Sequence, residues 1–179
     1  MPECVRDIVV LCGPSGSGKS TLGSTLRSAF PRGAVIEVDS VRMMLNKPAW
    51  NSNAEHRWAL RTVGALIALL LQQGVSPCIV CDTFPFDSRE ELLNQLSDRQ
   101  IYLVLLKASQ EELAERIRRR EREVRGTDSD SHCMMTIRNS AEQLNDCRDA
   151  CGADLVVDTT KASIADLNAT LVDFICGGR

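Results

Sequence analysis

The clearest chemical pattern in the chain is a glycine-rich stretch near its start, with the sequence GPSGSGKST. It fits the pattern G-x-x-x-x-G-K-[ST], follows an apolar run and precedes residues with helical periodicity. Glycines let the backbone N–H groups turn toward a phosphate, and the start of a helix adds partial positive charge. Lys19 would then reach the β- and γ-phosphates, while the Ser20 hydroxyl would ligate Mg²⁺. The sequence therefore predicts a nucleotide-binding loop, formed by Gly13, Pro14, Ser15, Gly16, Ser17, Gly18, Lys19, Ser20 and Thr21.

An acidic and a basic residue follow the next apolar run, in the sequence VDSVR. Ligands of parallel sheets collect at the carboxyl ends of the strands, where Asp39 would accept the proton of an attacking hydroxyl. Arg42, about one helical turn later, would hold an anion or the acceptor itself. The same position suits Asp39 as the N-cap of the following helix. The residues alone leave both roles open.

Asp82 ends a third apolar run, Cys78–Asp82. A carboxylate at this point can hold Mg²⁺ directly or through water, as in the strand-end acid of many nucleotide-binding proteins. Asp82 and Ser20 are therefore the predicted metal ligands.

A cluster of arginines follows the fourth apolar run, and its members are Arg116, Arg118, Arg119, Arg120, Arg122 and Arg125. Glutamates are interleaved with them, no aromatic residue is present for base stacking, and the chain carries a net charge of −3. This pattern gives little attraction for a polyanion. The polar break after Arg125 instead predicts a helical lid, approximately residues 116–138, that closes arginines over a triphosphate.

The elements that must position these residues alternate along the chain. Five apolar runs are expected strands, each followed by a helix: Asp7–Cys12, Ala34–Val38, Cys78–Asp82, Ile101–Leu106 and Asp154–Asp158. Expected helices include Ala54–Gln73, one near Met134–Cys151 and Ser163–Ile175. Near-continuous apolar strands of this kind predict an α/β fold with a five-stranded parallel sheet covered by helices on both faces. The length of 179 residues fits one domain, residues 1–179.

The eight cysteines do not resemble a disulfide or metal framework. Cys78 and Cys81 have C-x-x-C spacing, but on a strand they would point to opposite faces. Cys147 and Cys151 lack a matching ligand pair, and His56 and His132 are isolated in the sequence. Structural thiols are therefore expected. The chain also lacks a signal-peptide pattern and an apolar stretch of bilayer length, which favours a cytoplasmic protein without membrane contact.

Several motifs together resemble a known family. The segments GPSGSGKST, VDSVR, CDTF, the RG break in the lid and ADLVVDTTKASIADL are similar to those of chloramphenicol phosphotransferase and the wider group of small P-loop kinases. That group includes polynucleotide 5′-kinases and zeta-type toxins. The resemblance implies a P-loop kinase fold, with Asp39 as the base toward the acceptor hydroxyl. The D-x-x-R spacing of Asp39 and Arg42 is closer to polynucleotide kinases than to the antibiotic enzyme.

The function hypothesis is an ATP-dependent phosphotransferase that moves the γ-phosphate of ATP to a hydroxyl of a small molecule. A kinase for the 5′-hydroxyl of a nucleic acid is the alternative, and a non-catalytic nucleotide-binding switch is the third reading. Asp39, Lys19 and Arg42 are the expected catalytic residues, with Mg²⁺ as cofactor and no obligate protein partner. Beyond the loop, the expected ATP contacts are Arg116, Arg120, Arg125 and Thr159. Adenine is expected between the start of the lid helix and residues 158–161. The acceptor is expected to bind along Asn46–Arg61. In that segment, Trp50 and Trp58 could stack on the acceptor or have a structural role.

Overall fold

The structure is a computed structural model, and it describes residues 6–50, 52–83, 89–96, 99–146 and 152–177. Its elements follow in the order β1 (Ile8–Cys12), α1 (Lys19–Ala29), β2 (Ala34–Glu37), α2 (Val38–Arg42), α3 (Asn53–Gln72), β3 (Cys78–Asp82), α4 (Arg89–Gln95), β4 (Ile101–Lys107), α5 (Gln110–Arg125), α6 (Ser131–Asp146), β5 (Leu155–Asp158) and α7 (Ile164–Ile175). Strands and helices alternate as the apolar runs predict.

The strands form one parallel sheet in the order β2-β3-β1-β4-β5. The first strand is central and pairs with β3 on one side and β4 on the other. Its last residue, Cys12, lies opposite Asp82 of β3 and Leu105 of β4. The carboxyl ends of the central strands therefore meet at one edge, and the predicted α/β fold with a five-stranded parallel sheet is confirmed.

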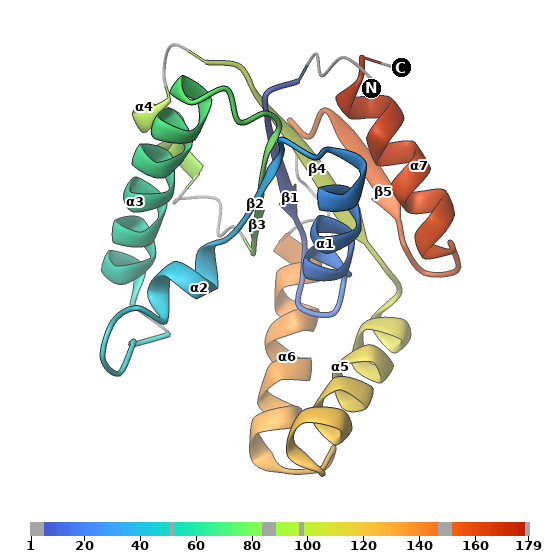
Figure 1. Ribbon diagram of the computed structural model, residues 1–179. Helices are drawn as coiled ribbons and strands as arrows, with labels where there is room; N and C mark the ends of the chain where they lie inside the picture. Colours follow the sequence, from blue (N-terminus) through green and yellow to red (C-terminus); the bar gives the residue numbers. More distant parts are fainter. Residues whose placement is uncertain (1–5, 51, 84–88, 97–98, 147–151, 178–179) are drawn as a thin grey trace.

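Alternation along the strands divides the core into two layers. In β1, Val9 and Leu11 pack with buried residues of α1 and α7, whereas Ile8 and Val10 pack with those of α3 and α4. Figure 1 shows these helix pairs on opposite faces of the sheet. Because both faces are covered, the strands are apolar at nearly every position.

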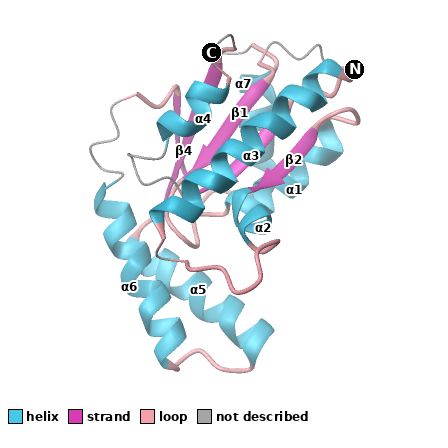
Figure 2. Ribbon diagram, turned by 90° about the vertical axis from the view of Figure 1, so that its left-hand side faces the viewer, coloured by secondary structure: helices cyan, strands magenta, loops and turns pink. Residues whose placement is uncertain are grey.

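Helices α5 and α6 form a hairpin that extends beyond the carboxyl edge of the sheet (Figure 2). The side chain of Ser109 caps α5 by accepting the backbone N–H of Glu112. This lid hairpin, Gln110–Asp146, starts earlier and ends later than the predicted lid, approximately residues 116–138, because that prediction followed the arginines and the polar break after them.

Other boundaries differ by a few residues. β2 ends at Glu37, so Asp39 lies in the first turn of α2 and not at a strand end. α6 begins at Ser131, before the predicted Met134, and the predicted end at Cys151 lies outside the described residues, as does Cys147. Among the described helices, none combines the length and apolar character needed to cross a membrane.

Cys78 and Cys81 behave as the strand pattern predicts. Cys78 packs in the layer of α3, and Cys81 packs in the layer of α1. Burial raises the pKa of Cys81 to about 12, so its thiol stays protonated. Within the described parts of the chain, no group of three or more His, Cys, Asp or Glu side chains could hold a metal ion by itself.

Candidate active site

The glycine-rich loop runs from the end of β1 to the start of α1. Gly13 has φ 147°, and a Cβ added to it would lie 2.3 Å from the carbonyl oxygen of Leu106 in β4. Only glycine fits a backbone passing so close to the neighbouring strand. Lys19 donates from Nζ to the carbonyl oxygens of Gly13 and Pro14, at 2.8 and 3.0 Å. Burial lowers the pKa of this ammonium group.

A cavity of about 660 Å³ opens beside this loop. It has the size of a typical small-molecule or cofactor site. Its walls come from the loop, from the ends of β2 and β3, from α5 and from the segment after β5. The residues that line it are Ser15, Gly16, Ser17, Gly18, Lys19, Ser20, Thr21, Leu22, Glu37, Asp39, Cys81, Asp82, Thr83, Glu112, Arg116, Arg119, Arg120, Glu123, Thr159, Thr160, Lys161, Ala162, Ile164 and Leu167. The cavity thus gathers most of the predicted site residues and omits Gly13, Pro14, Arg42 and Arg125.

Asp39 lies in the first turn of α2 and lines this cavity. The position that caps α2 is held by Glu37, and no side chain makes the capping hydrogen bond. Asp39 is therefore not the N-cap of α2, a role that the sequence had left open. Partial desolvation by the cavity walls raises the pKa of Asp39, and the nearby charge of Asp82 adds to the shift. A carboxylate with a raised pKa is a stronger base than an ordinary aspartate.

Glu37 is a site residue that sequence reasoning missed. It lines the cavity, and its Oε2 accepts a hydrogen bond from the Ser20 hydroxyl at 3.2 Å. Burial raises its pKa as well. The signal available in the sequence was the pair Glu37 and Asp39, two acids separated by one apolar residue at the end of an apolar run.

Asp82 is buried at the end of β3 and lines the same cavity. Its Oδ1 accepts the backbone N–H of Thr83 at 2.8 Å. Its Oδ2 lies 2.9 Å from Nε2 of His56, which is an ion pair when the imidazole is protonated, and neither atom has a hydrogen-bond partner among the described residues. A buried carboxylate oxygen without a donor fits a cation ligand, and with the Ser20 hydroxyl it offers oxygen ligands that Mg²⁺ prefers.

His56 is the second residue that the sequence did not single out for the site. It is buried on α3, and its imidazole contacts the Asp82 carboxylate but does not line the cavity. No sequence pattern indicates this contact, because α3 and β3 meet only through the tertiary fold.

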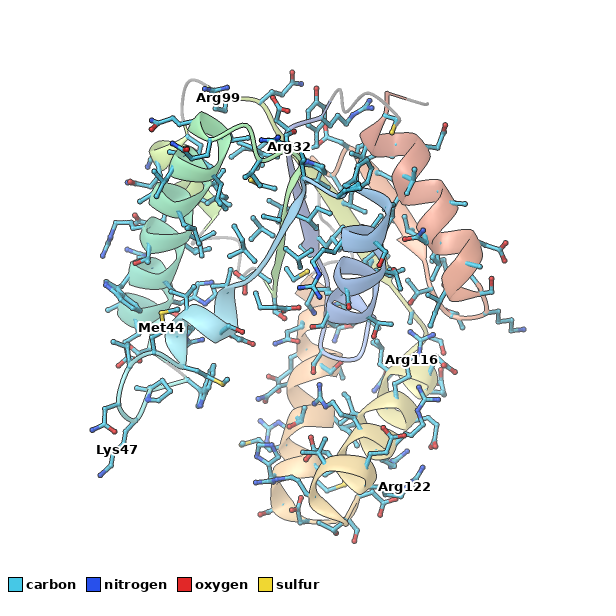
Figure 3. The ribbon with its side chains drawn as sticks, in the orientation of Figure 1. Arg32, Met44, Lys47, Arg99, Arg116 and Arg122 are labelled. Atoms are coloured by element: carbon cyan, nitrogen blue, oxygen red, sulfur yellow. The ribbon has the colours of Figure 1, made fainter. Side chains whose placement is uncertain are left out.

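The sheet end of α5 binds the phosphate loop and the segment after β5. Arg116 donates to the hydroxyl and carbonyl oxygens of Thr159, at 3.0 and 2.6 Å, and to the Gly16 carbonyl at 3.4 Å. The buried Thr159 hydroxyl also contacts the carbonyl oxygens of Ser17 and Lys107. Figure 3 shows Arg116 on the half of α5 that lies nearer the sheet. Arg116 and Thr159 both line the cavity, and their contacts with ATP stay predictions.

The other lid arginines divide into two groups. Arg119, which the sequence-based set omitted, lines the cavity together with Arg120. Arg125 lies away from it and forms ion pairs with Glu121 and Asp130, at 3.8 and 3.6 Å. Arg125 therefore joins the two helices of the lid hairpin in this structure, and its contact with ATP stays a prediction.

Arg42 is buried and turned toward the following loop. Its guanidinium donates to the carbonyl oxygens of Ala49 and Trp50, at 3.0 and 2.9 Å, and lies 4.8 Å from the centre of the Trp50 ring. Arg42 therefore contacts the following loop in this structure and does not line the cavity, and its role toward the acceptor stays a prediction. Within the predicted acceptor segment, Trp58 packs against the core and Trp50 stacks on Arg42, so both have structural contacts.

Known proteins share this fold. An adenylyl-sulfate kinase of Bacillus pumilus is 35% identical over 95 residues, which cover 50% of this chain and 47% of that protein. The chain thus spans about half the length of the curated relatives it matches. The crystal structure of a gluconokinase from Sinorhizobium meliloti 1021 has a TM-score of 0.66 and 22% identity, covering 97% of this chain and 95% of that one.

A second structure is the Mycobacterium tuberculosis APS kinase in complex with AMPPNP and APS. It has a TM-score of 0.63 and 18% identity, and the match covers 94% of this chain and 96% of that chain. Identities this low bear on the fold alone, and they confirm the P-loop kinase fold. The narrower resemblance to chloramphenicol phosphotransferase and polynucleotide kinases stays a prediction. Residues 8–144 match the family AAA_33, described as an AAA domain, and because this is more than half of the chain, the protein belongs to that family.

Proposed function

We propose that this protein is an ATP-dependent phosphotransferase that moves the γ-phosphoryl group of ATP to a hydroxyl of a small molecule. The observation that carries the proposal is the position of Asp39. Its carboxylate opens into the cavity that the phosphate loop lines, it does not cap its helix, and its pKa is raised. A nucleotide-binding switch would not require a base at this point.

The loop provides the phosphate contacts. On ATP binding, Lys19 exchanges the carbonyl oxygens of Gly13 and Pro14 for the β- and γ-phosphates. Ser20 and Asp82 would hold Mg²⁺, which would neutralise charge on the phosphates, and Glu37 orients the Ser20 hydroxyl. Arg119 and Arg120 of the lid supply further positive charge to the cavity. Adenine lies between Arg116 and residues 158–161, since Arg116 and residues 159–161 line the cavity.

The transfer itself then follows. Asp39 accepts the proton of the acceptor hydroxyl while the acceptor oxygen forms a bond to the γ-phosphorus. The bond from that phosphorus to the bridging oxygen breaks, and the electron pair leaves with ADP. The protein supplies position and charge, which are the main requirements of phosphoryl transfer.

The nucleic-acid alternative has less support than the small-molecule reading. It drew on the D-x-x-R spacing, but Arg42 is bonded to the loop carbonyls and does not line the cavity. The relatives named above include kinases of adenylyl sulfate and gluconokinase, which favours a small acceptor.

The experiment is a transfer assay with ATP labelled on its γ-phosphate. The acceptors are adenylyl sulfate, gluconate, a panel of other small hydroxyl compounds and 5′-hydroxyl oligonucleotides, each tested with the wild type and with Asp39→Asn. Label on a small compound, lost in Asp39→Asn, is the expected result. Label on the oligonucleotides alone would favour the alternative, and ATP binding with no transfer to any acceptor would favour a switch.

A further inference from the structure

The phosphate loop is held from outside by the second helix of the lid hairpin. The buried Ser140 hydroxyl donates to the carbonyl oxygen of Ser15 at 2.7 Å. One turn further along α6, the Gln143 side chain accepts the backbone N–H of Ser15 at 3.0 Å. Both polar backbone groups of one loop residue are therefore bonded to side chains on the same face of α6.

The first helix of the lid hairpin contacts the next residue of the loop. Arg116 of α5 donates to the carbonyl oxygen of Gly16 at 3.4 Å. A Cβ added to Gly16 would lie 3.0 Å from the carbonyl oxygen of Leu113 and 3.3 Å from the Ile117 side chain. The lid hairpin thus packs directly on two successive residues of the loop.

These contacts bear on the loop's ability to bind phosphate. A phosphate loop works through backbone N–H groups that already point at the ligand, so the rotation of each peptide unit matters. The N–H of Ser15 points away to Gln143, and the carbonyl of the same residue is fixed by Ser140. With both peptide units around Ser15 held, the N–H groups that follow it in the loop have a defined direction.

We propose that Ser140 and Gln143 are positioning residues for phosphoryl transfer, which hold the Ser15 peptide units so that the loop is preorganised for the triphosphate. The inference rests on the proposed function for the transfer step, but its effect on ATP binding does not require any acceptor. It also makes the lid hairpin and the phosphate loop one mechanical unit, because a shift of α6 must move Ser15.

The test measures the affinity for a non-hydrolysable ATP analogue with Mg²⁺ in the variants Ser140→Ala and Gln143→Met. Methionine is close to glutamine in size but offers no strong acceptor, and the half-buried position tolerates it. Asn145→Leu changes an exposed amide on the same helix and is the matched control. We expect each test variant to bind the analogue roughly two- to tenfold more weakly, the range for one neutral hydrogen bond.

Melting temperature and AMP binding separate positioning from general structure. AMP does not fill the β and γ positions, so its affinity should stay at the wild-type value in a folded variant. Wild-type affinity for the ATP analogue in both variants would overturn the proposal, as would an equal loss for AMP. Where transfer is measurable, the fall in kcat should match or exceed the fall in affinity. An absence of transfer in the wild type would count against the proposed function and leave the binding test intact.

Discussion

The charged groups at the floor of the cavity differ from those at the far end of the lid hairpin. At the cavity floor, which we define as Lys19, Glu37, Asp39 and Asp82, burial lowers the pKa of Lys19 and raises the pKa values of Glu37 and Asp39. Each of these shifts disfavours the charged form. At the far end of the hairpin, hydrogen bonds from Arg122 to Asp128 and Glu115 raise the pKa of Arg122 and favour its charged form.

The difference indicates what each set of charges is for. Exposed charges of the hairpin are matched by one another, and such surface pairs contribute little to stability. Charges of the floor are partly desolvated and incompletely matched among the described residues, an arrangement typical of sites that complete their interactions with a ligand. The floor should therefore carry the activity, and the far end of the hairpin should be replaceable.

The largest effect is expected from Lys19→Ala. The change removes the charge that meets the transferring phosphate, so ATP affinity should fall and turnover should be lost. Binding of the ATP analogue and transfer of label measure the two quantities, with the melting temperature as the control for folding. Unchanged turnover in this variant would end the kinase hypothesis.

Asp39→Asn should lower kcat by about 10²–10⁴-fold, the usual contribution of general-base catalysis, with ATP affinity retained. The amide keeps the shape of the side chain but cannot accept the proton. Steady-state kinetics with an identified acceptor measures the change. Wild-type kcat would overturn the mechanism, and a sharp shift in Mg²⁺ dependence would instead make Asp39 a metal ligand.

The pH dependence of the wild type gives a related prediction. Asp39 acts in its charged form, and its pKa lies above the ordinary value of 3.8, so kcat should fall as pH drops through that raised pKa. The folded state binds this proton more tightly than the unfolded chain does. Stability from this group is therefore greatest in acid and declines as pH rises through the folded pKa. Asp39→Asn should abolish the fall of kcat at low pH, and it should not lower the melting temperature at neutral pH.

A smaller effect is expected from His56→Leu. Nε2 of the imidazole lies 2.9 Å from Oδ2 of Asp82. Removing a group that supports a metal ligand costs metal affinity, here by about tenfold. The Mg²⁺ concentration for half-maximal ATP turnover measures the loss. His132→Leu, at an exposed position on α6, is the control. Equal Mg²⁺ requirements in wild type and His56→Leu would mean that Asp82 needs no such support.

The smallest effects are expected from substitutions of two arginines on the same helix, α5. Arg116 lies nearer the sheet than Arg122 on α5 (Figure 3). Arg116 is bonded to Thr159 and Gly16, and Arg122 is paired with Glu115 and Asp128. Arg116→Ala should weaken binding of the ATP analogue, whereas Arg122→Ala should leave affinity and melting temperature unchanged. A clear loss of affinity in Arg122→Ala would show that the far end of the hairpin takes part in the site.

Prediction from sequence succeeded where short-range patterns determine the structure. The apolar runs predicted the five strands, because a doubly covered parallel sheet requires apolar residues at nearly every strand position. The order of glycines, lysine and serine predicted the phosphate loop, since few backbone paths allow those close approaches. These features depend on neighbours in the chain.

The partners of side chains from distant segments could not be predicted in the same way. Arg42 was expected near the acceptor but is bonded to the loop around Trp50, and Arg125 pairs within the lid hairpin. His56 contacts Asp82, and Gln143 contacts Ser15, across long separations in the chain. Charge and spacing indicate that an arginine or histidine will find a partner, but only the packed fold decides which one.

The central place of β1 in the sheet has a consequence for synthesis on the ribosome. The chain is made from the N-terminus, and β1 is among the first described residues to leave the exit tunnel. Its two neighbours, β3 and β4, begin only at Cys78 and Ile101, so this apolar strand has no partner while the intervening helices are being made. The phosphate loop shares that delay, because its contacts with Thr159 and Gln143 come later still. A nascent chain therefore completes its nucleotide site only after Thr159 has been made, and until then β1 is a segment for chaperones to protect.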